Sequence, residues 1–142
     1  NPVITKPFIK NNKRYSMSII KFTPDQLTYD ASPIDATKVI SGNPHQELSN
    51  VFTNVKDNFF CGVWRSTVGK WTIQYTEDEF CLLTRGLVIL TDADGIEITI
   101  KAGDAFTIPA GFDGTWETLE DCEKYYAIYE DSAAHSEHQT FP

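Results

Sequence analysis

The sequence has no uninterrupted apolar segment of the roughly 18 residues that a membrane-spanning helix needs, and its first residues lack the apolar core of a signal peptide. Basic side chains are also scarce, because 12 lysines and arginines stand against 20 acidic residues and give a formal charge of −8. This balance disfavours binding to nucleic acid or to anionic membrane surfaces. We therefore expect neither nucleic acid nor membrane as a partner.

Cysteine is rare as well, with three residues in the chain. Their number is odd, and no two of them have a Cys-x-x-Cys spacing. Cys81 lies inside an apolar run, and Cys61 follows two phenylalanines. These features favour reduced, mostly buried thiols over disulfides, and they predict a reducing, cytoplasmic location.

Runs of helical length and period are missing from the second part of the chain. Short segments rich in Val, Ile, Thr, Tyr, Phe and Trp are separated there by turn residues, a pattern typical of a closed β-barrel or a sandwich. One turn is expected at Asp92–Gly95, where Gly95 supplies a positive φ, and another at residues 102–104. The predicted strands are residues 59–66, 70–76, 79–84, 86–91, 96–101, 105–108, 113–119 and 124–129.

The chain divides into four predicted segments. Residues 1–16 are basic and form a tail or an arm, and residues 17–50 are a polar N-terminal extension of loops or short edge strands. A short helix is expected to start at Thr23-Pro24. Residues 51–130 form the barrel, and residues 131–142 are a polar C-terminal tail.

Two motifs stand at a matching distance inside the predicted barrel. The first runs from Glu79 through six residues to Gly86, and the second runs from Gly103 through five residues to Pro109-Ala110-Gly111. Together they resemble the two halves of the signature of the cupin superfamily. The resemblance implies an all-β fold, the double-stranded β-helix, which is an RmlC-like jelly-roll barrel.

Metal-binding cupins carry three histidines in these motifs, and this sequence has none of them. Their places are taken by Ile73, Tyr75 and Gly114. Because several imidazoles are needed to hold a transition metal in such a site, the carboxylate of Glu79 does not suffice. We therefore expect no metal and no other cofactor in the barrel. The chain's histidines lie outside the predicted barrel: His45, His135 and His138.

A finer resemblance covers roughly residues 55–130. Cys61-Gly62-Val63-Trp64, Tyr75–Phe80, Pro109–Glu117 and Glu123–Tyr126 are similar to segments of cupins related to the ureidoglycine aminohydrolase domain and to ethanolamine-utilisation protein Q. Full-length aminohydrolases of that type have two cupin domains and a metal-binding histidine set, neither of which is found here. The resemblance therefore implies the fold but transfers no activity.

The alternation of side chains along a strand predicts which residues face the barrel interior. The last strand contributes Lys124 and Tyr126, and its alternative inward pair is Tyr125 and Ala127. The predicted ligand-binding residues are Trp71, Tyr75, Glu79, Trp116, Lys124 and Tyr126, and four of them are candidate catalytic residues: Glu79, Lys124, Tyr75 and Tyr126.

Each of these residues also has a purely structural interpretation. Trp71 and Trp116 could fill the barrel as core, and Trp64 is expected there. Glu79 and Lys124 could form a structural ion pair or lie solvated at the rim. An acid and a base held in an apolar wall would equally orient a polar ligand, because an unpaired buried charge is costly.

Three functions are compatible with this sequence. The first is a metal-free cupin that binds a small polar metabolite in a sensory or helper role. The second is a small enzyme, such as an isomerase, lyase or hydrolase, that uses Glu79, Lys124 and tyrosines for proton transfer. The third is a metalloenzyme with an atypical site. Since cupins of this size commonly pair, we also expect a homodimer, in which segments such as Ser18–Phe22 add to a sheet edge or pack across the partner.

Overall fold

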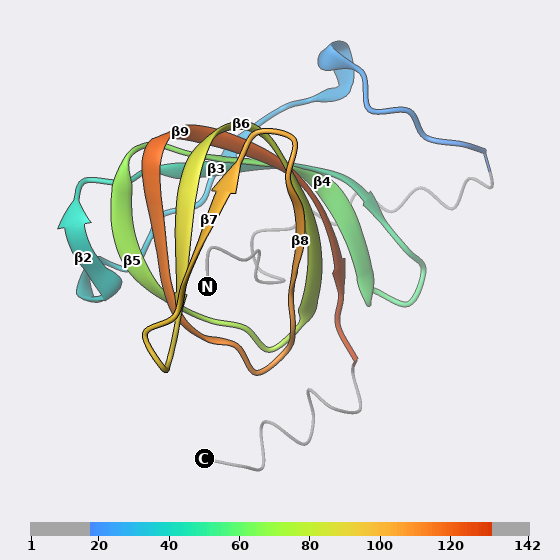
Figure 1. Ribbon diagram of the computed structural model, residues 1–142. Coiled ribbons are helices and arrows are strands. Elements are labelled where there is room, and N and C mark those ends of the chain that lie inside the picture. The colour runs from blue at the N-terminus through green and yellow to red at the C-terminus, as the bar shows by residue number, and fades with distance from the viewer. Residues whose placement is uncertain (1–17, 132–142) are drawn as a thin grey trace.

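The computed structural model describes residues 18–131, and in that range it confirms the predicted all-β fold. Nine strands belong to one curled antiparallel sheet. Helix is limited, within the same range, to two 3₁₀ turns, η2 (Pro24–Gln26) and η3 (Ala36–Lys38). Figure 1 shows the strands curling around a central interior. The predicted tail of residues 1–16 and nearly all of residues 131–142 lie outside the described residues.

The strands follow one another with short connections. In chain order they are β1 (Asp30–Ala31), β2 (Val39–Gly42), β3 (Gln46–Thr53), β4 (Phe59–Ser66), β5 (Gly69–Gln74), β6 (Asp78–Asp92), β7 (Glu97–Lys101), β8 (Ala105–Ile108) and β9 (Asp113–Tyr129).

Two long strands, β6 and β9, arch over the barrel and take part in both of its layers (Figure 1). In the first layer, residues 78–85 of β6 and 123–129 of β9 pair with each other and continue through β8 on one side and β4, β3 and β1 on the other. In the second layer, the other halves of β6 and β9 continue through β7, and through β5 and β2. The two layers face each other and enclose the core.

The prediction that residues 79–84 and 86–91 are separate strands was wrong, and so was the division of 113–119 from 124–129. Each pair is one bent strand. The bend in β6 lies at Gly86, which has φ +96°, and the register with β9 shifts on both sides of it. A Cβ at Gly86 would lie 2.5 Å from the carbonyl oxygen of Asp121, so glycine lets the two strands stay in contact through the bend.

The N-terminal extension contributes three strands to the sheet. β2 adds to β5 and β1 adds to β3, each at an edge, as expected for short edge strands. β3 is longer and lies between β1 and β4, beginning five residues before residue 51. The helical start at Thr23-Pro24 is confirmed by η2, which has proline in its first turn.

The turn chemistry read from the sequence is also confirmed. Gly95 has φ +80° and donates its N–H to the carbonyl of Asp92, while Asp92 Oδ1 accepts the N–H groups of Asp94 and Ile96. Gly103 has φ +95° in the next turn. Among residues 18–131 there is no helix long and apolar enough to cross a membrane.

Candidate functional site

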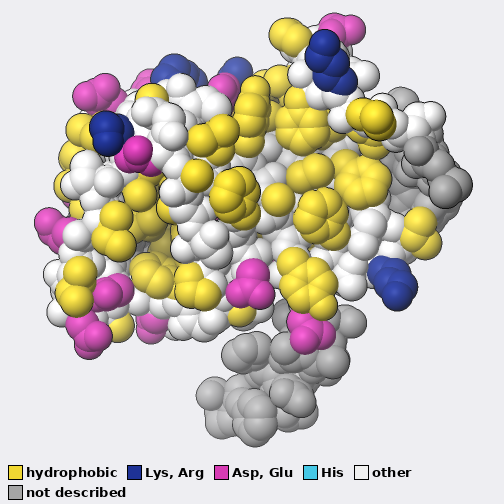
Figure 2. Space-filling view, turned by 45° about the vertical axis from the view of Figure 1, so that its right-hand side comes forward, with side chains coloured by type: hydrophobic (Ala, Val, Ile, Leu, Met, Phe, Trp, Pro, Cys, Tyr) yellow, Lys and Arg dark blue, Asp and Glu magenta, His cyan; other side chains and the backbone are white. Residues whose placement is uncertain are grey.

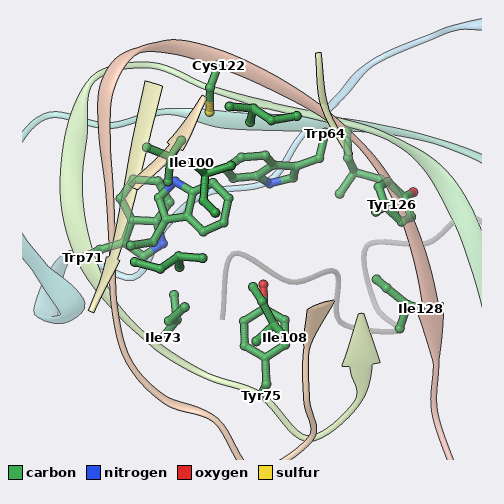
Figure 3. Close-up of a cluster of buried hydrophobic side chains, with 14 of the residues drawn as sticks. Trp64, Trp71, Ile73, Tyr75, Ile100, Ile108, Cys122, Tyr126 and Ile128 are labelled. Atoms are coloured by element: carbon green, nitrogen blue, oxygen red, sulfur yellow. The ribbon is translucent and has the colours of Figure 1, made fainter. Parts of the chain in front are cut away.

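Three tryptophans from three strands gather at one end of the barrel interior. Trp64 of β4, Trp71 of β5 and Trp116 of β9 are each at most 1% exposed, and their ring centroids lie 5.1–6.4 Å apart. Trp71 and Trp116 are directly paired across β5 and β9, so strand register brings these two indoles together. Figure 3 shows Trp64 and Trp71 on the same side of the interior, with Tyr75 opposite them.

A buried ion pair lies beside this cluster. Lys124 Nζ is 3.0 Å from Glu79 Oε2, and both side chains are 1% exposed. The same ammonium lies 4.7 Å from the ring centroids of both Trp64 and Trp116, so two indole faces stabilise it as well. Burial lowers the pKa of Lys124, but the nearby Cys81 and the carboxylate of Glu79 more than offset that effect, and the pKa is raised overall. Lys124 is therefore held in its charged form.

Two phenols complete the polar interior, and they differ in their partners. Tyr126 donates a hydrogen bond of 2.8 Å to Asn50 Oδ1. Tyr75 faces Glu79, but its hydroxyl forms no hydrogen bond of good geometry. Burial raises the pKa of both tyrosines well above the usual value, and the carboxylate of Glu79 adds to this rise. Both phenols are therefore neutral donors at physiological pH.

Four buried polar atoms in this interior have no hydrogen-bond partner in the structure. Nearly all buried polar atoms in folded proteins are hydrogen-bonded, so four exceptions in one region require an explanation. Glu79 Oε1 is an acceptor, and Lys124 Nζ has its ion-pair contact but no well-directed hydrogen bond. The four atoms are Trp71 Nε1, Tyr75 OH, Glu79 Oε1 and Lys124 Nζ.

The six residues expected to face the interior are all buried. Lys124 and Tyr126 are 1% and 2% exposed, whereas Tyr125, from the alternative pair, is 42% exposed. Glu79 and Lys124 lie in the interior rather than at the rim. The structure thus brings five of the six residues together: Trp71, Tyr75, Glu79, Trp116 and Lys124. The sixth, Tyr126, is held by its hydrogen bond to Asn50.

Three residues outside the predicted ligand-binding set also take part in this arrangement. Trp64 is core, as expected, but it also contacts the ammonium of Lys124. Cys81 is completely buried next to Glu79 and Lys124, and burial raises the pKa of its thiol well above the usual value. Asn50 fixes Tyr126 from β3, at the residue just before the predicted barrel segment. The alternation of side chains along the strand, which places Glu79 in the interior, places Cys81 there as well.

The glycine in Cys61-Gly62-Val63-Trp64 has a specific structural cause. A Cβ at Gly62 would lie 2.1 Å from the carbonyl oxygen of Ser49 and 2.6 Å from the hydroxyl of Tyr126. The backbone of β3 and the phenol of Tyr126 occupy the space that any side chain would need. Gly62 therefore lets Tyr126 reach Asn50.

We expect Gly62→Ala to lower the free energy of unfolding by about 1–3 kcal/mol, because an added methyl group forces β3 and Tyr126 to shift. Urea denaturation of both proteins would measure this. Gly111→Ala is the matched control, since a Cβ at that position meets no atom within 4 Å and only the positive φ of +93° opposes it. An equal effect in both variants would contradict the steric explanation.

The positions of the missing histidines lie on the inner wall of the barrel. Ile73 is buried on β5 and Tyr75 is buried directly after the end of that strand, and Ile73 is paired with Gly114 on β9. A Cβ at Gly114 would lie 2.0 Å from the carbonyl oxygen of Thr91, so no larger side chain fits there without a backbone shift. Within residues 18–131, no three His, Cys, Asp or Glu side chains come close enough to form a ligand set.

The buried acids make stability fall at alkaline pH. Cys81, Tyr75 and Tyr126 all have raised pKa values in the folded protein, so above pH 9.0, the usual value for cysteine, the unfolded chain loses protons that the folded chain keeps. The unfolded state then binds fewer protons, and the free energy of unfolding decreases as pH rises. The raised pKa of Lys124 acts in the same direction above its usual 10.5. Urea denaturation at pH 8 and pH 10 should show this loss, and Cys81→Ala should reduce it.

A separate cleft of about 640 Å³ is lined by loop residues together with the buried Gln46 and Ser66. It lies between the loops that precede β2 and β3, the turn after β4 and the bends of β6 and β9. Its wall includes Arg65 and Arg85 together with Glu47 and Asp121, so it carries charges of both signs. None of the six predicted site residues lines it.

Comparison with known proteins agrees with the fold. The sequence matches the EutQ-like cupin domain over residues 54–126. A protein of unknown function from Pseudomonas syringae pv. tomato, of the DUF861 family, is similar over 72% of this chain with 28% identity and a TM-score of 0.65. This chain spans 43% of that protein's length. No match was found among curated proteins.

Two further solved structures show the same fold. The EutQ protein of Clostridium difficile is similar over 75% of this chain and 97% of its own, with 11% identity and a TM-score of 0.57. A protein of unknown function from Rhizobium leguminosarum is similar over 81% of this chain and 100% of its own, with 19% identity and a TM-score of 0.60. At these identities the likeness concerns the fold alone.

Proposed function

Because the chain belongs to the family of EutQ-like cupin domains, we propose that it binds a small polar metabolite inside the barrel, without a metal ion. The ligand lies between the indole cluster and Tyr75. Glu79 and Lys124 orient it by charge and hydrogen bonding. Its role is sensory or that of a helper to a pathway.

The observation that carries this proposal is the set of four unpartnered polar atoms in the interior. Three of the groups can donate a hydrogen bond, namely the indole of Trp71, the phenol of Tyr75 and the ammonium of Lys124, and Glu79 Oε1 accepts one. A ligand that presents acceptors to the donors and an N–H or O–H to Glu79 would satisfy all four. Small molecules with a carboxylate or amide group on a flat, partly apolar body have this chemistry, and such a body would stack on the indoles.

Tyr75→Phe is the sharpest test of the ligand site, because it removes one oxygen that has no hydrogen-bond partner in the protein. We expect the melting temperature of the unliganded variant to equal or exceed that of the wild type. The thermal shift caused by any hit from a metabolite library should be clearly smaller in the variant. Tyr126→Phe is the control, since it breaks the bond to Asn50 and should cost about 1 kcal/mol of stability on its own.

Failure of this test takes a definite form. If a library of carboxylates and amides gives no thermal shift, and mass spectrometry of the denatured protein finds no released small molecule, the interior is a packed core with a structural ion pair. If a ligand binds but Tyr75→Phe leaves its thermal shift unchanged, the ligand does not contact Tyr75 and the proposed location is wrong.

The enzyme alternative rests on the same residues but is less well supported. A lysine that acts as a base must be neutral, whereas the pKa of Lys124 is raised. The raised pKa values of Tyr75 and Tyr126 keep both phenols protonated, so neither is available as a base. Glu79 Oε1 remains as the one candidate base. The metalloenzyme alternative requires a metal cation bound to Glu79, the only inward carboxylate of the motif. The ammonium of Lys124 already lies 3.0 Å from that carboxylate and would repel the cation.

The thiols support the location that we propose. Cys61, Cys81 and Cys122 are free in the structure, and the last two are completely buried. Three free cysteines favour a reducing compartment. We therefore place the protein in the cytoplasm as part of this proposal.

A further inference from the structure

The cleft of about 640 Å³ gathers charged side chains of both signs. Figure 2 shows, by contrast, a face of the molecule where hydrophobic side chains prevail and most charged groups lie at the margins. The volume of the cleft falls within the range of about 300–1,000 Å³ that is typical of pockets for small molecules. Because the six predicted ligand-binding residues of the interior do not line it, the cleft is a second candidate site.

Hydrogen bonds and close packing hold the walls of the cleft in place. Thr67 donates its backbone N–H to the carbonyl of His45 at 2.9 Å, and His45 donates its own N–H to Thr67 Oγ1 at 2.8 Å. Pro44 packs directly on Gly69, since a Cβ at Gly69 would lie 2.6 Å from the proline ring. A ligand would therefore enter a site that is already formed, and little of its binding free energy would be lost in ordering the walls.

Arg65, in the wall of the cleft, is held by side chains of the chain itself. Its Nε lies 2.9 Å from Glu123 Oε2, and its Nη1 lies 3.4 Å from Glu47 Oε1. The guanidinium also lies 3.9 Å from the ring centroid of Tyr29. Glu123 Oε1 accepts the hydroxyl of Thr84 at 2.9 Å, so both oxygens of that carboxylate are occupied. Arg65 and its two carboxylates therefore form a fixed group whose charges compensate one another.

Arg85 and Asp121 also line the cleft, and their charges have no such compensation. Both residues are exposed, and neither forms an ion pair with any residue between 18 and 131. The residue opposite Arg85 in the pairing of β6 with β9 is Glu123, whose carboxylate is already occupied. The bends of the two strands touch here, because a Cβ at Gly86 would lie 2.5 Å from the carbonyl oxygen of Asp121. Within the described part of the chain, the cleft thus presents one unpaired guanidinium and one unpaired carboxylate on adjoining bends.

We propose that this cleft binds a small zwitterion, namely a free α-amino acid with an apolar side chain. Arg85 binds the carboxylate of the ligand and Asp121 binds its ammonium group, which are attached to the same carbon and so can reach both side chains. The apolar side chain of the ligand packs on the part of the wall that is formed by Pro33, Ile34 and Pro44. Net charge agrees with this choice, because a protein of charge −8 repels free anions but not a ligand without net charge.

The floor of the cleft is in hydrogen-bond contact with the tryptophan cluster of the interior. Gln46, which lines the cleft and is 7% exposed, accepts the indole N–H of Trp64 through its Oε1 at 3.1 Å. Trp71 does not line the cleft, and its Nε1 is one of the unpartnered atoms of the interior. The indole N–H of Trp64 is therefore a spectroscopic probe of the cleft, and that of Trp71 is a probe of the interior.

The experiment is a titration of the full chain with L-leucine and L-phenylalanine at millimolar concentration, followed by ¹H–¹⁵N spectra of the three indole groups. We expect at least one of these amino acids to shift the resonance of Trp64 and to leave that of Trp71 in place. Arg85→Gln and Asp121→Asn should each raise the dissociation constant at least about fivefold, because each removes a charge-assisted hydrogen bond. Lys101→Gln is the matched control, since it removes an exposed positive charge outside the cleft and should leave binding unchanged.

A second measurement changes the ligand instead of the protein. L-Phenylalaninamide lacks the carboxylate and 3-phenylpropionate lacks the ammonium group, so both should bind the wild type at least about fivefold more weakly than L-phenylalanine. No shift of Trp64 with either amino acid, a shift that Arg85→Gln leaves intact, or equally tight binding of 3-phenylpropionate would each overturn the proposal. A shift of Trp71 alone would place the amino acid in the interior, which would overturn the cleft site and support the metabolite site inside the barrel.

Discussion

Replacing Lys124 with methionine should lower the free energy of unfolding by about 3–5 kcal/mol, since removal of one partner of a buried ion pair leaves the other charge uncompensated. Lys124 and Glu79 are each 1% exposed, and their closest atoms are 3.0 Å apart. Glu79 Oε1 already lacks a hydrogen-bond partner, so in the variant neither carboxylate oxygen would be compensated. Chemical denaturation near pH 7.5 measures the loss.

The double variant Glu79→Leu/Lys124→Met is the control for this prediction. Replacing a buried ion pair by apolar residues of similar volume is often neutral or stabilising, so we expect the double variant to regain most of the lost stability. A double variant that folds and no longer binds the metabolite would separate the structural part of the pair from its proposed role in binding. If Lys124→Met costs less than about 1 kcal/mol, water reaches the pair and the interior is not as closed as its burial indicates.

Much of this fold could be predicted because its signals are local. The turn at Gly95 requires a positive φ, which glycine supplies. The inward positions of Glu79 and Lys124 follow from the two-residue repeat of a β-strand, in which successive side chains point to opposite faces. The continuity of β6 could not be predicted in the same way. A glycine such as Gly86 is usually taken as the end of a strand, but here it permits a bend within one strand. The carbonyl of Asp121, on a strand distant in sequence, lies where a side chain at position 86 would be.

The polar interior was predictable in part for the same reason. The alternation of side chains predicted separately that Glu79 and Lys124 face the interior. Their 3.0 Å contact depends on the pairing of β6 with β9, which places Leu83 opposite Lys124 and Glu79 opposite Ile128. The hydrogen bond from Tyr126 to Asn50 could not be predicted, because β3 begins in a segment whose composition is typical of loops. Long-range pairing of strands, rather than local pattern, decides these contacts.

Trp116→Ala should lower the free energy of unfolding by about 3–5 kcal/mol, which corresponds to roughly 10–15 °C in melting temperature. The size of this loss distinguishes a core indole from an indole that forms an exposed wall of the site. Trp116 is 0% exposed, and its ring lies 5.1 Å from that of Trp64, 6.4 Å from that of Trp71 and 6.3 Å from that of Phe106. Its Nε1 donates a hydrogen bond of 2.9 Å to Thr118 Oγ1. The alanine variant would therefore leave a cavity and lose the hydrogen bond to Thr118, whose hydroxyl keeps its 2.6 Å hydrogen bond with Ser66 Oγ. It would also remove one of the two indoles that face Lys124.

Trp116→Phe is the matched variant, because it keeps an aromatic face near Lys124 and loses the hydrogen bond and part of the volume. We expect it to retain more than half of the stability that Trp116→Ala loses, which thermal and urea denaturation of the three proteins would show. A loss below about 1 kcal/mol in Trp116→Ala would mean that the indole packs against open space instead of against its neighbours. Ligand binding would then depend on Trp116 far more than folding does, and the interior would be an accessible pocket with a tryptophan wall.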